Sequence, residues 1–298
     1  MVNSFKVNQP FNNVRLDKWF TQNVKKLPHS LIEKLIRTKK IKVNNKKVKS
    51  SYRLSTNDLV SVYNLEKYAA FQNKIKNKYK ASKKEKKNIE DLIIEDNENF
   101  IIINKPEGIP VQSGTKSFRN IIDIVKDLKT FSISKPFIVH RLDKETSGVM
   151  IISKNRLYAQ LFTSLFRIRK IHKTYHAIVK GNIGIRKKIL NEDLFYFEGN
   201  KKIRQKATTK VRLIKYSNGL SFLELNPITG RKHQLRKQLS FIGHPIYGDD
   251  KYILDKKLKT KNKELMLHSY EIKFIINNNK YNYRALLPLY FKKIIKTK

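Results

Sequence analysis

The segment from Val139 to Asn155 places one acidic side chain, Asp143, between two apolar runs. It reads V-H-R-L-D-K-E-T-S-G-V-M-I-I-S-K-N, with Phe137 to Val139 forming the first apolar run and Gly148 to Ile152 the second. Short apolar runs bounded by polar and glycine residues are typical of buried strands. The segment therefore predicts that Asp143 lies on a turn between two buried strands.

The neighbours of Asp143 indicate which chemistry it can perform. Arg141 and Lys144 flank it, and His140 lies just before them. A nearby cation favours the charged form of a carboxyl group. Asp143 is therefore a candidate nucleophile or base at neutral pH and a poor candidate acid.

The tetrapeptide R-L-D-K also occurs at Arg15–Lys18, where its setting is different. The apolar residues Leu16, Trp19, Phe20 and Val24 follow the spacing of an amphipathic helix there. An aspartate in the first helical turn complements the helix dipole, which is a structural role. The alternative that Asp143 merely caps a turn and pairs with an arginine therefore stays open on the tetrapeptide alone.

Charge is the strongest global signal in the 298-residue chain. Its formal net charge is +41, from 65 Lys and Arg against 24 Asp and Glu, which favours a polyanionic partner such as nucleic acid. A codon bias toward Lys, Asn and Ile explains part of this excess.

The absence of cysteine excludes disulfides and thiolate zinc sites. No apolar run approaches the ~20 residues of a membrane span, and the N-terminal segment has no signal core, so we expect a cytoplasmic protein.

The length predicts about two domains. Residues 14–63 form a small basic module whose first helix begins near Arg15 and whose second has Ser30 as its N-cap. The second helix region bears the cations Lys34, Arg37 and Lys40. A hairpin is expected next, with Ile41–Val43 and Lys46–Val48 around Asn44–Asn45, followed by a strand at Leu59–Tyr63.

Residues 64–89 are lysine-rich with little apolar periodicity, which predicts a basic linker. The remainder, 90–298, is expected to be the catalytic domain. Its short β-rich runs and helices lack a regular βαβ rhythm, which predicts an α+β fold with a mixed, largely antiparallel sheet. The expected strands are Asn99–Ile103, Phe137–Val139, Gly148–Ser153, Thr174–Val179, Lys210–Tyr216 and Ser221–Leu225, and the expected helices Ile121–Leu128, Leu157–Phe166 and Arg231–Ile242.

Five motifs occur in order along this second part. They are K-P-E-G-I-P-V-Q-S-G from Lys105, H-R-L-D-x-x-T-S-G from His140, K-x-Y-x-A-x-V-x-G from Lys173, P-x-T-G-R-x-H-Q-L-R from Pro227 and G-x-P-I-x-G-D from Gly243. In these motifs the chain resembles the RluA family of pseudouridine synthases, in the branch that modifies large-subunit ribosomal RNA. The basic module resembles the S4 RNA-binding domain, a small α/β domain, with Asn45 where that family prefers glycine. Gln238 departs from the synthase pattern, which usually has histidine there.

The resemblance implies a role for several residues. Asp143 would be the catalytic carboxylate, Arg236 its ion-pair partner and Tyr175 the ring stacked on the uracil. Leu235 would pack beside the base, and Arg141 would contact the RNA. Further RNA contacts are expected from Arg231, His140, Lys34, Arg37 and Lys40.

Structural alternatives remain for some of these residues. Tyr175 has the β preference of an ordinary strand aromatic, and Arg231 suits a general phosphate clamp. His172 and His176 have the spacing of helical metal ligands but lie in a β-type segment, so no metal is expected. His233 is interpreted as a structural hydrogen-bonding residue.

The sequence thus predicts a monomeric isomerase of uridines in ribosomal RNA that needs no cofactor. Two alternatives are a non-catalytic ribosome-assembly factor that binds ribosomal RNA, and an enzyme with the same chemistry that acts on tRNA.

Overall fold

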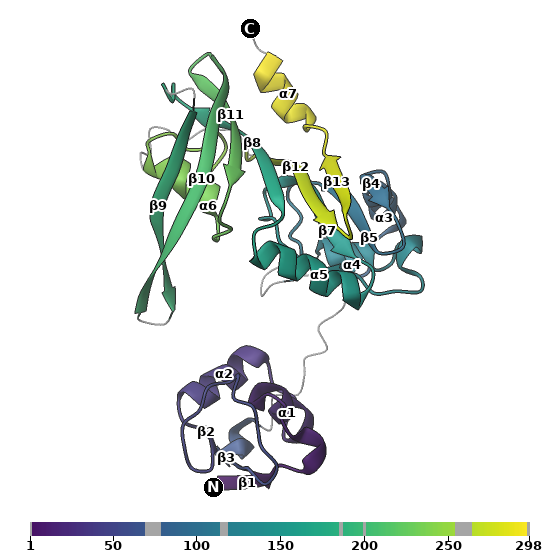
Figure 1. Ribbon diagram of the computed structural model, residues 1–298, viewed down its shortest axis with the longest axis vertical. Helices are drawn as coiled ribbons and strands as arrows, with labels where there is room; N and C mark the ends of the chain where they lie inside the picture. The colour runs from purple at the N-terminus through teal and green to yellow at the C-terminus, as the bar shows by residue number, and fades with distance from the viewer. Residues whose placement is uncertain are drawn as a thin grey trace. The chain divides into compact units, whose positions relative to one another are not determined.

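The computed structural model describes residues 2–68, 79–113, 119–184, 187–198, 201–253 and 264–296. The chain divides into two compact units, Met1–Lys78 and Tyr79–Lys298, and each is described by itself (Figure 1). None of the helices in these ranges combines the length and apolar character that crossing a bilayer requires.

The first unit packs two helices on a small antiparallel sheet. Helices α1 (Leu16–Asn23) and α2 (His29–Arg37) share one apolar core with a sheet of strand order β1-β3-β2. The strands are β1 (Val2–Lys6), β2 (Ile41–Val43) and β3 (Leu59–Tyr63), and the short 3-10 helices are η1 (Gln9–Phe11) and η2 (Leu65–Tyr68).

The helical spacing predicted for α1 is confirmed, because Leu16, Trp19 and Phe20 are buried. Asp17 lies in the first turn and is buried as well, where its Oδ1 accepts a hydrogen bond from Arg15 Nε at 3.1 Å. This copy of the tetrapeptide therefore has the structural role that its helical setting predicts.

Two predicted details of this unit are wrong. Helix α2 begins two residues earlier than expected, with Pro28 instead of Ser30 as the N-cap, because the Pro28 carbonyl already accepts from Leu31 and Ile32 N–H. The two asparagines do form the expected turn with positive φ, but Lys46 makes only an isolated bridge to Val43. All three residues of β2 pair with β3, which takes the place of the predicted partner Lys46–Val48.

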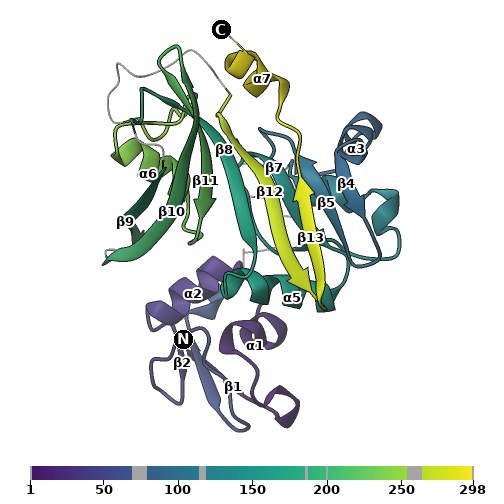
Figure 2. The ribbon, with the colours of Figure 1, turned by 45° about the horizontal axis from the view of Figure 1, so that its top comes forward.

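The second unit is built on a ten-stranded sheet in which the described pairs are antiparallel except for β7 with β12, as predicted for a mixed, largely antiparallel sheet. The strand order is β4-β5-β7-β12-β8-β11-β10-β9, with β13 beside β12 and β6 beside β7. Figure 2 shows β8 and β12 side by side in the middle of this sheet. The strands are β4 (Ile93–Asp96), β5 (Phe100–Lys105), β6 (Phe137–Ile138), β7 (Ser147–Ser153), β8 (His172–Lys180), β9 (Lys187–Glu198), β10 (Lys201–Ser217), β11 (Leu220–Pro227), β12 (Leu267–Ile276) and β13 (Asn279–Arg284).

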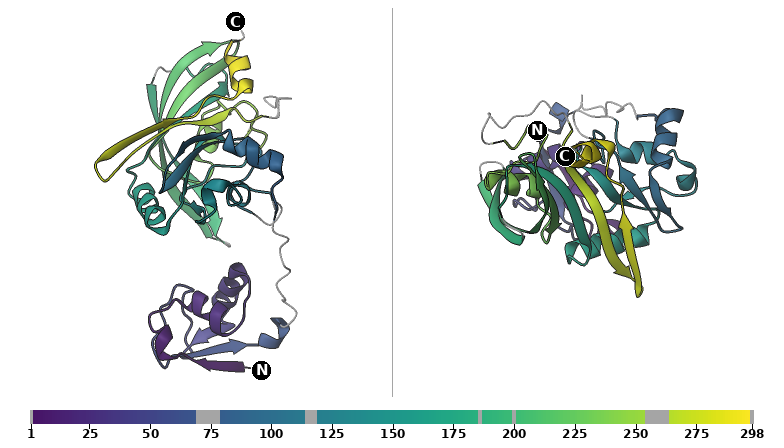
Figure 3. Two further views of the ribbon diagram at one scale, coloured as in Figure 1. Left: turned by 90° about the vertical axis from the view of Figure 1, so that its right-hand side faces the viewer. Right: turned by 90° about the horizontal axis from the view of Figure 1, so that it is seen from above.

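Helices cover both faces of the β5–β7 half of the sheet, and Figure 3 shows this half from two further directions. Met150 and Ile152 of β7 share a core with α4, whereas Val149 and Ile151 share a core with α5 on the opposite face. The apolar run that follows Asp143 is continuous because β7 is buried on both faces. The helices are α3 (Lys83–Glu90), α4 (Ile121–Val125), α5 (Arg156–Arg167), α6 (Gln234–Phe241) and α7 (Leu289–Lys296), with the 3-10 helix η3 (Lys129–Phe131).

The segment expected to be a linker, 64–89, differs from the prediction over its second part. Residues 69–78 lie outside the described residues, but Tyr79 onward belongs to the second unit. Ser82 and Glu85 form a capping box that starts α3, and Ile89 at its end is buried. The lysine run therefore lies on the exposed side of a short, capped helix.

We predict that Gly148→Ala strongly destabilises the second unit. Gly148 has φ +113°, and a Cβ added there would lie 2.1 Å from the Ser269 carbonyl oxygen of the paired strand β12. Gly184→Ala is the matched control, because its φ is +65° but a Cβ would meet no described atom within 4 Å. A left-handed backbone alone costs an L-amino acid ~1–2 kcal/mol. Urea denaturation should show a loss of unfolding free energy above this value only for Gly148→Ala. Equal losses in both variants would contradict the steric explanation.

Candidate active site

Asp143 lies on the turn between β6 and β7, as predicted. The two strands pair antiparallel through Ile138 and Ile152, and Thr146 N–H donates to the Asp143 carbonyl at 3.2 Å to close the turn. The Asp143 side chain is 28% exposed, so it is accessible to a ligand while its backbone is held between strands.

His140 fixes the start of this turn. Its Nε2 accepts a hydrogen bond from Ile151 N–H at 2.9 Å, and its ring stacks on Phe166 of α5 with centroids 4.7 Å apart. Burial lowers the pKa of His140 to about 3, so the ring is neutral and can accept this bond. The structure gives His140 a positioning role within the protein.

Arg236 of α6 lies close to Asp143 but has a stronger partner. Its Nε and Nη2 donate to the two carboxylate oxygens of Asp249 at 2.7 and 2.8 Å. Its remaining nitrogen, Nη1, lies 3.8 Å from Asp143 Oδ2 and 3.7 Å from Glu145 Oε2. Burial alone would lower the pKa of this guanidinium, but the hydrogen bond and charge of Asp249 outweigh it, so the pKa is raised.

Asp249 is a site residue that sequence reasoning missed. Its side chain is 1% exposed, and its Oδ1 also accepts from the backbone N–H groups of Lys251 and Tyr252. Asp249 neutralises the buried guanidinium and occupies its Nε and Nη2. Nη1 of Arg236 is therefore left on the side of Asp143. The available signal was the final aspartate of the G-x-P-I-x-G-D motif.

Two buried glutamines anchor α6 to β10 and so place Arg236. Gln234 Nε2 donates to Thr208 O at 3.1 Å, and its Oε1 accepts from Thr229 Oγ1 at 2.7 Å. Gln238 Oε1 accepts from Thr209 Oγ1 at 2.6 Å. The departure at Gln238 is therefore accommodated by a hydrogen-bonded contact to the sheet.

Tyr175 lies on β8, where two apolar cores meet. Its partly buried ring packs against the core around α6 and also against the core around α4. Burial raises the pKa of Tyr175 to about 12, a hydrogen bond with Ser269 opposes the rise, and the charge of Asp143 adds to it. The phenol is therefore neutral and close enough to Asp143 to respond to its charge.

Lys105 is a second residue that sequence reasoning missed. Its buried Nζ donates to the carbonyls of Pro106 at 2.7 Å and Lys144 at 3.2 Å, which ties β5 to the Asp143 turn. Burial lowers the pKa of Lys105 to about 7, against the attraction of Glu145 and Asp143. The signal was a lysine two residues after an apolar run and just before Pro106.

The structure thus brings Asp143, Tyr175 and Arg236 together. Leu235 is 7% exposed and belongs to the core on which Tyr175 packs, Arg231 Nε donates to Lys206 O at 3.1 Å, and Arg141 is exposed. The exposed cations Lys34, Arg37 and Lys40 lie in the first unit.

This arrangement combines a carboxylate held beside a guanidinium with an aromatic ring partly open to solvent. Such a pair of groups can bind a planar ligand and attack it, or remove a proton from it. Within the described ranges, no group of three His, Asp or Glu side chains is arranged to hold a metal ion.

Comparison with known proteins finds relatives for both parts of the chain. Residues 99–241 match the family model for RNA pseudouridylate synthase, and residues 14–60 match the S4 domain. The ribosomal large subunit pseudouridine synthase C of Rickettsia felis is 34% identical, over 96% of each chain. The protein of the same name from Buchnera aphidicola (subspecies Acyrthosiphon pisum) is 30% identical, over 98% of this chain and 96% of its own. The structure of human RNA pseudouridylate synthase domain containing 4 matches with a TM-score of 0.59 and 26% identity, over 70% of this chain and 92% of its own.

We predict that Asp249→Asn destabilises the second unit, because it removes the charge that compensates the buried Arg236 guanidinium. The loss should be on the order of 3 kcal/mol, since breaking a buried ion pair costs roughly 3–5 kcal/mol and the amide oxygen still accepts one hydrogen bond. The neighbouring Asp250 is exposed, so Asp250→Asn changes the net charge equally and should leave stability nearly unchanged. Urea denaturation followed by circular dichroism compares them, and similar losses would remove Asp249 from this role.

Proposed function

The chain belongs to the RNA pseudouridylate synthase family, and on this premise we propose that it isomerises specific uridines of large-subunit ribosomal RNA to pseudouridine. The relatives that match nearly its whole length carry that activity in their names. The observation that supports the proposal in this chain is the approach of Asp143 to Arg236 and Tyr175 in one site.

The reaction is an isomerisation in which atoms and electrons balance within the substrate. The C1′–N1 glycosidic bond breaks, the detached uracil turns, a C1′–C5 bond forms, and the C5 proton leaves while N1 gains one. No oxidant, reductant or energy source enters this balance, which supports catalysis without a cofactor. Asp143 begins the reaction by attacking the ribose, attacking the uracil ring, or removing the ribose 2′ proton.

The neighbouring residues have distinct roles in this proposal. Tyr175 stacks on the uracil, and Leu235 packs beside the base. Arg236 holds the carboxylate of Asp143 in place with its Nη1, which Asp249 does not engage. His140, which is already bonded to Ile151 N–H, orients the turn, while Arg141 on the same turn contacts the RNA.

Binding must supply the energy to take the target base out of its helix. Extrusion costs a few kcal/mol, whereas stacking on one aromatic ring returns roughly 1–3 kcal/mol. Phosphate contacts supply the remainder, which gives the net charge of +41 a function. Arg231 is a phosphate ligand in this proposal.

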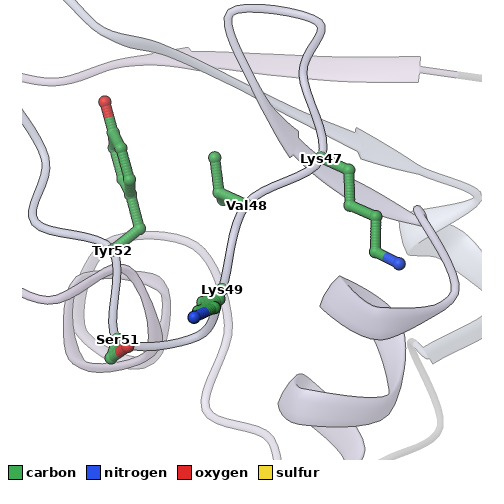
Figure 4. A pocket seen from close by; sticks show the side chains of 5 residues that line it. All are labelled: Lys47, Val48, Lys49, Ser51 and Tyr52. Atoms are coloured by element: carbon green, nitrogen blue, oxygen red, sulfur yellow. The ribbon is translucent and has the colours of Figure 1, made fainter.

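The first unit supplies a second RNA-binding surface. Lys34, Arg37 and Lys40 are exposed together at α2 and just after it. A pocket of about 360 Å³ lies on the same unit, lined by Lys47, Val48, Lys49, Ser51 and Tyr52 (Figure 4). Tyr52 is 36% exposed, and its ring is suited to stack on an unpaired base between the lysines.

Ribosomal RNA is the partner in this proposal, and it supports a cytoplasmic site of action. We further propose that the chain works as a monomer. One chain contributes both the RNA-binding residues of the first unit and the residues around Asp143 in the second.

We predict that Asp143→Asn abolishes turnover and leaves RNA affinity within a few-fold, because phosphate contacts dominate binding. Release of tritium from ribosomal RNA labelled at uracil C5 measures turnover, and filter binding measures affinity. Asp250→Asn makes the same charge change at an exposed position and should retain turnover.

Normal tritium release by Asp143→Asn would end this assignment. Wild-type protein that binds ribosomal RNA without release would support an assembly factor. Release from tRNA but not from ribosomal RNA would support the tRNA enzyme.

We also predict that replacing Lys34, Arg37 and Lys40 together by glutamine weakens RNA binding and leaves single-turnover rates at saturating RNA unchanged. If each cation contacts a phosphate, the slope of log K against log salt should become shallower by about 2–3. The control replaces the exposed Lys83, Lys84 and Lys87 of α3, which removes the same charge. Equal weakening by both triple variants would mean that net charge, and not this surface, binds RNA.

A further inference from the structure

His233 has a left-handed backbone conformation, which is uncommon for any residue other than glycine. It precedes α6 with φ 55° and ψ 31°, in the left-handed region that β-carbons disfavour. Its carbonyl accepts from Lys237 N–H at 3.0 Å and so begins the helix, yet its side chain does not cap the helix. Strained backbone of this kind clusters at functional sites, so the contacts of the imidazole decide its role.

The imidazole bridges Tyr252 and Asp143. Its Nδ1 lies 3.1 Å from Tyr252 Oη, and its Nε2 lies 3.7 Å from Asp143 Oδ1. Catalytic hydrogen bonds are often this long in free enzymes and tighten when substrate binds. His233 therefore approaches one oxygen of the carboxylate while Arg236 Nη1 approaches the other, at 3.8 Å.

The surrounding charges select one protonation state of His233. Burial lowers its pKa, the cations Arg236, Lys251 and Lys232 lower it further, and Asp143 opposes them. The ring is therefore neutral at pH 7 and carries a single N–H hydrogen.

The position of that hydrogen follows from the two neighbours. On Nδ1, it would leave the Nε2 lone pair facing a carboxylate, which is repulsive. On Nε2, it faces Asp143, while Nδ1 accepts from the Tyr252 hydroxyl. Burial raises the pKa of Tyr252, so the phenol keeps its proton and can donate it.

One short segment supports both sides of the carboxylate. Asp249 binds the Arg236 guanidinium, and Tyr252, three residues later, binds His233. The Tyr252 ring also lies 5.2 Å from the Arg236 guanidinium carbon and meets the His233 ring edge-on, with centroids 5.5 Å apart. The two groups that approach Asp143 are therefore both held by the segment Asp249–Tyr252.

We propose that His233 is a positioning residue for the isomerisation, which donates its Nε2 hydrogen to Asp143 Oδ1 and fixes the plane of the carboxylate against the substrate. A neutral donor orients the carboxylate without adding a second cation, so the oxygens keep their reactivity. This inference rests on the proposed function and adds a residue that the sequence assigns only to structure.

Two amide substitutions distinguish the loss of the Nε2 hydrogen-bond donor from an effect on the left-handed backbone. His233→Gln places an amide N–H near the position of Nε2, whereas the shorter amide of His233→Asn reaches only the position of Nδ1. Asparagine tolerates the left-handed backbone best, so a loss of activity in His233→Asn cannot be attributed to strain at the start of α6. Single-turnover rate and RNA affinity are measured for both.

We expect His233→Asn to slow single turnover by about 10- to 100-fold, as loss of a hydrogen bond to a charged group does, with RNA affinity unchanged. His233→Gln should stay within a few-fold of wild type, and added imidazole should partly restore His233→Ala. A wild-type rate in His233→Asn, or equal losses in the Asn and Gln variants, would overturn the proposal.

A readout without activity tests the same geometry. The ¹⁵N shifts of the His233 ring at pH 7 should show a protonated Nε2 and an unprotonated Nδ1, and Tyr252→Phe should weaken this preference. A protonated Nδ1 in the wild type would refute the inference while leaving the proposed function intact. Wild-type protein with no tritium release would instead refute the proposed function, and this inference with it.

Discussion

The site depends on the buried ion pair between Arg236 and Asp249. A guanidinium that is 5% exposed must find charge and acceptors inside the protein. Asp249 provides both through two hydrogen bonds, and it also accepts from the backbone N–H groups of the following turn. The third nitrogen of Arg236 is left to face Asp143, so the orientation of the Asp143 carboxylate is a consequence of a pair that does not include it.

The local structure around Asp143 could be predicted because residues adjacent in the sequence determine it. Two apolar runs with a polar interval indicate strand, turn and strand, and the helical spacing around Asp17 indicates a different setting for the same tetrapeptide. The partner of Arg236 could not be predicted in this way. Asp143 and Asp249 both lie in the quoted motifs, and only the packing of α6 on β10 decides which one forms two hydrogen bonds with the guanidinium. The left-handed backbone of His233 likewise could not be predicted, since histidine, although enriched in this region, is mostly found elsewhere.

Most of the cations of this chain lie on its surface, whereas three of its buried histidine rings are neutral. Burial lowers the pKa of His140 to about 3 and those of His176 and His268 to about 4, so these rings stay uncharged within a protein of net charge +41. The positive charge therefore lies where RNA can reach it. Arg236 and Lys105 are buried cations, and both lie beside the Asp143 turn, where carboxylates are close to them.

Tyr175 lies where the two apolar cores of the catalytic unit meet. The distance between its ring and the Asp143 turn is therefore set by side-chain volumes in both halves of the sheet. A methyl group gained or lost deep in either core would therefore shift Tyr175 relative to the Asp143 turn in the proposed site. Substrate discrimination in this fold can consequently evolve through interior residues that never touch the nucleotide, and comparison of surface residues alone would overlook them.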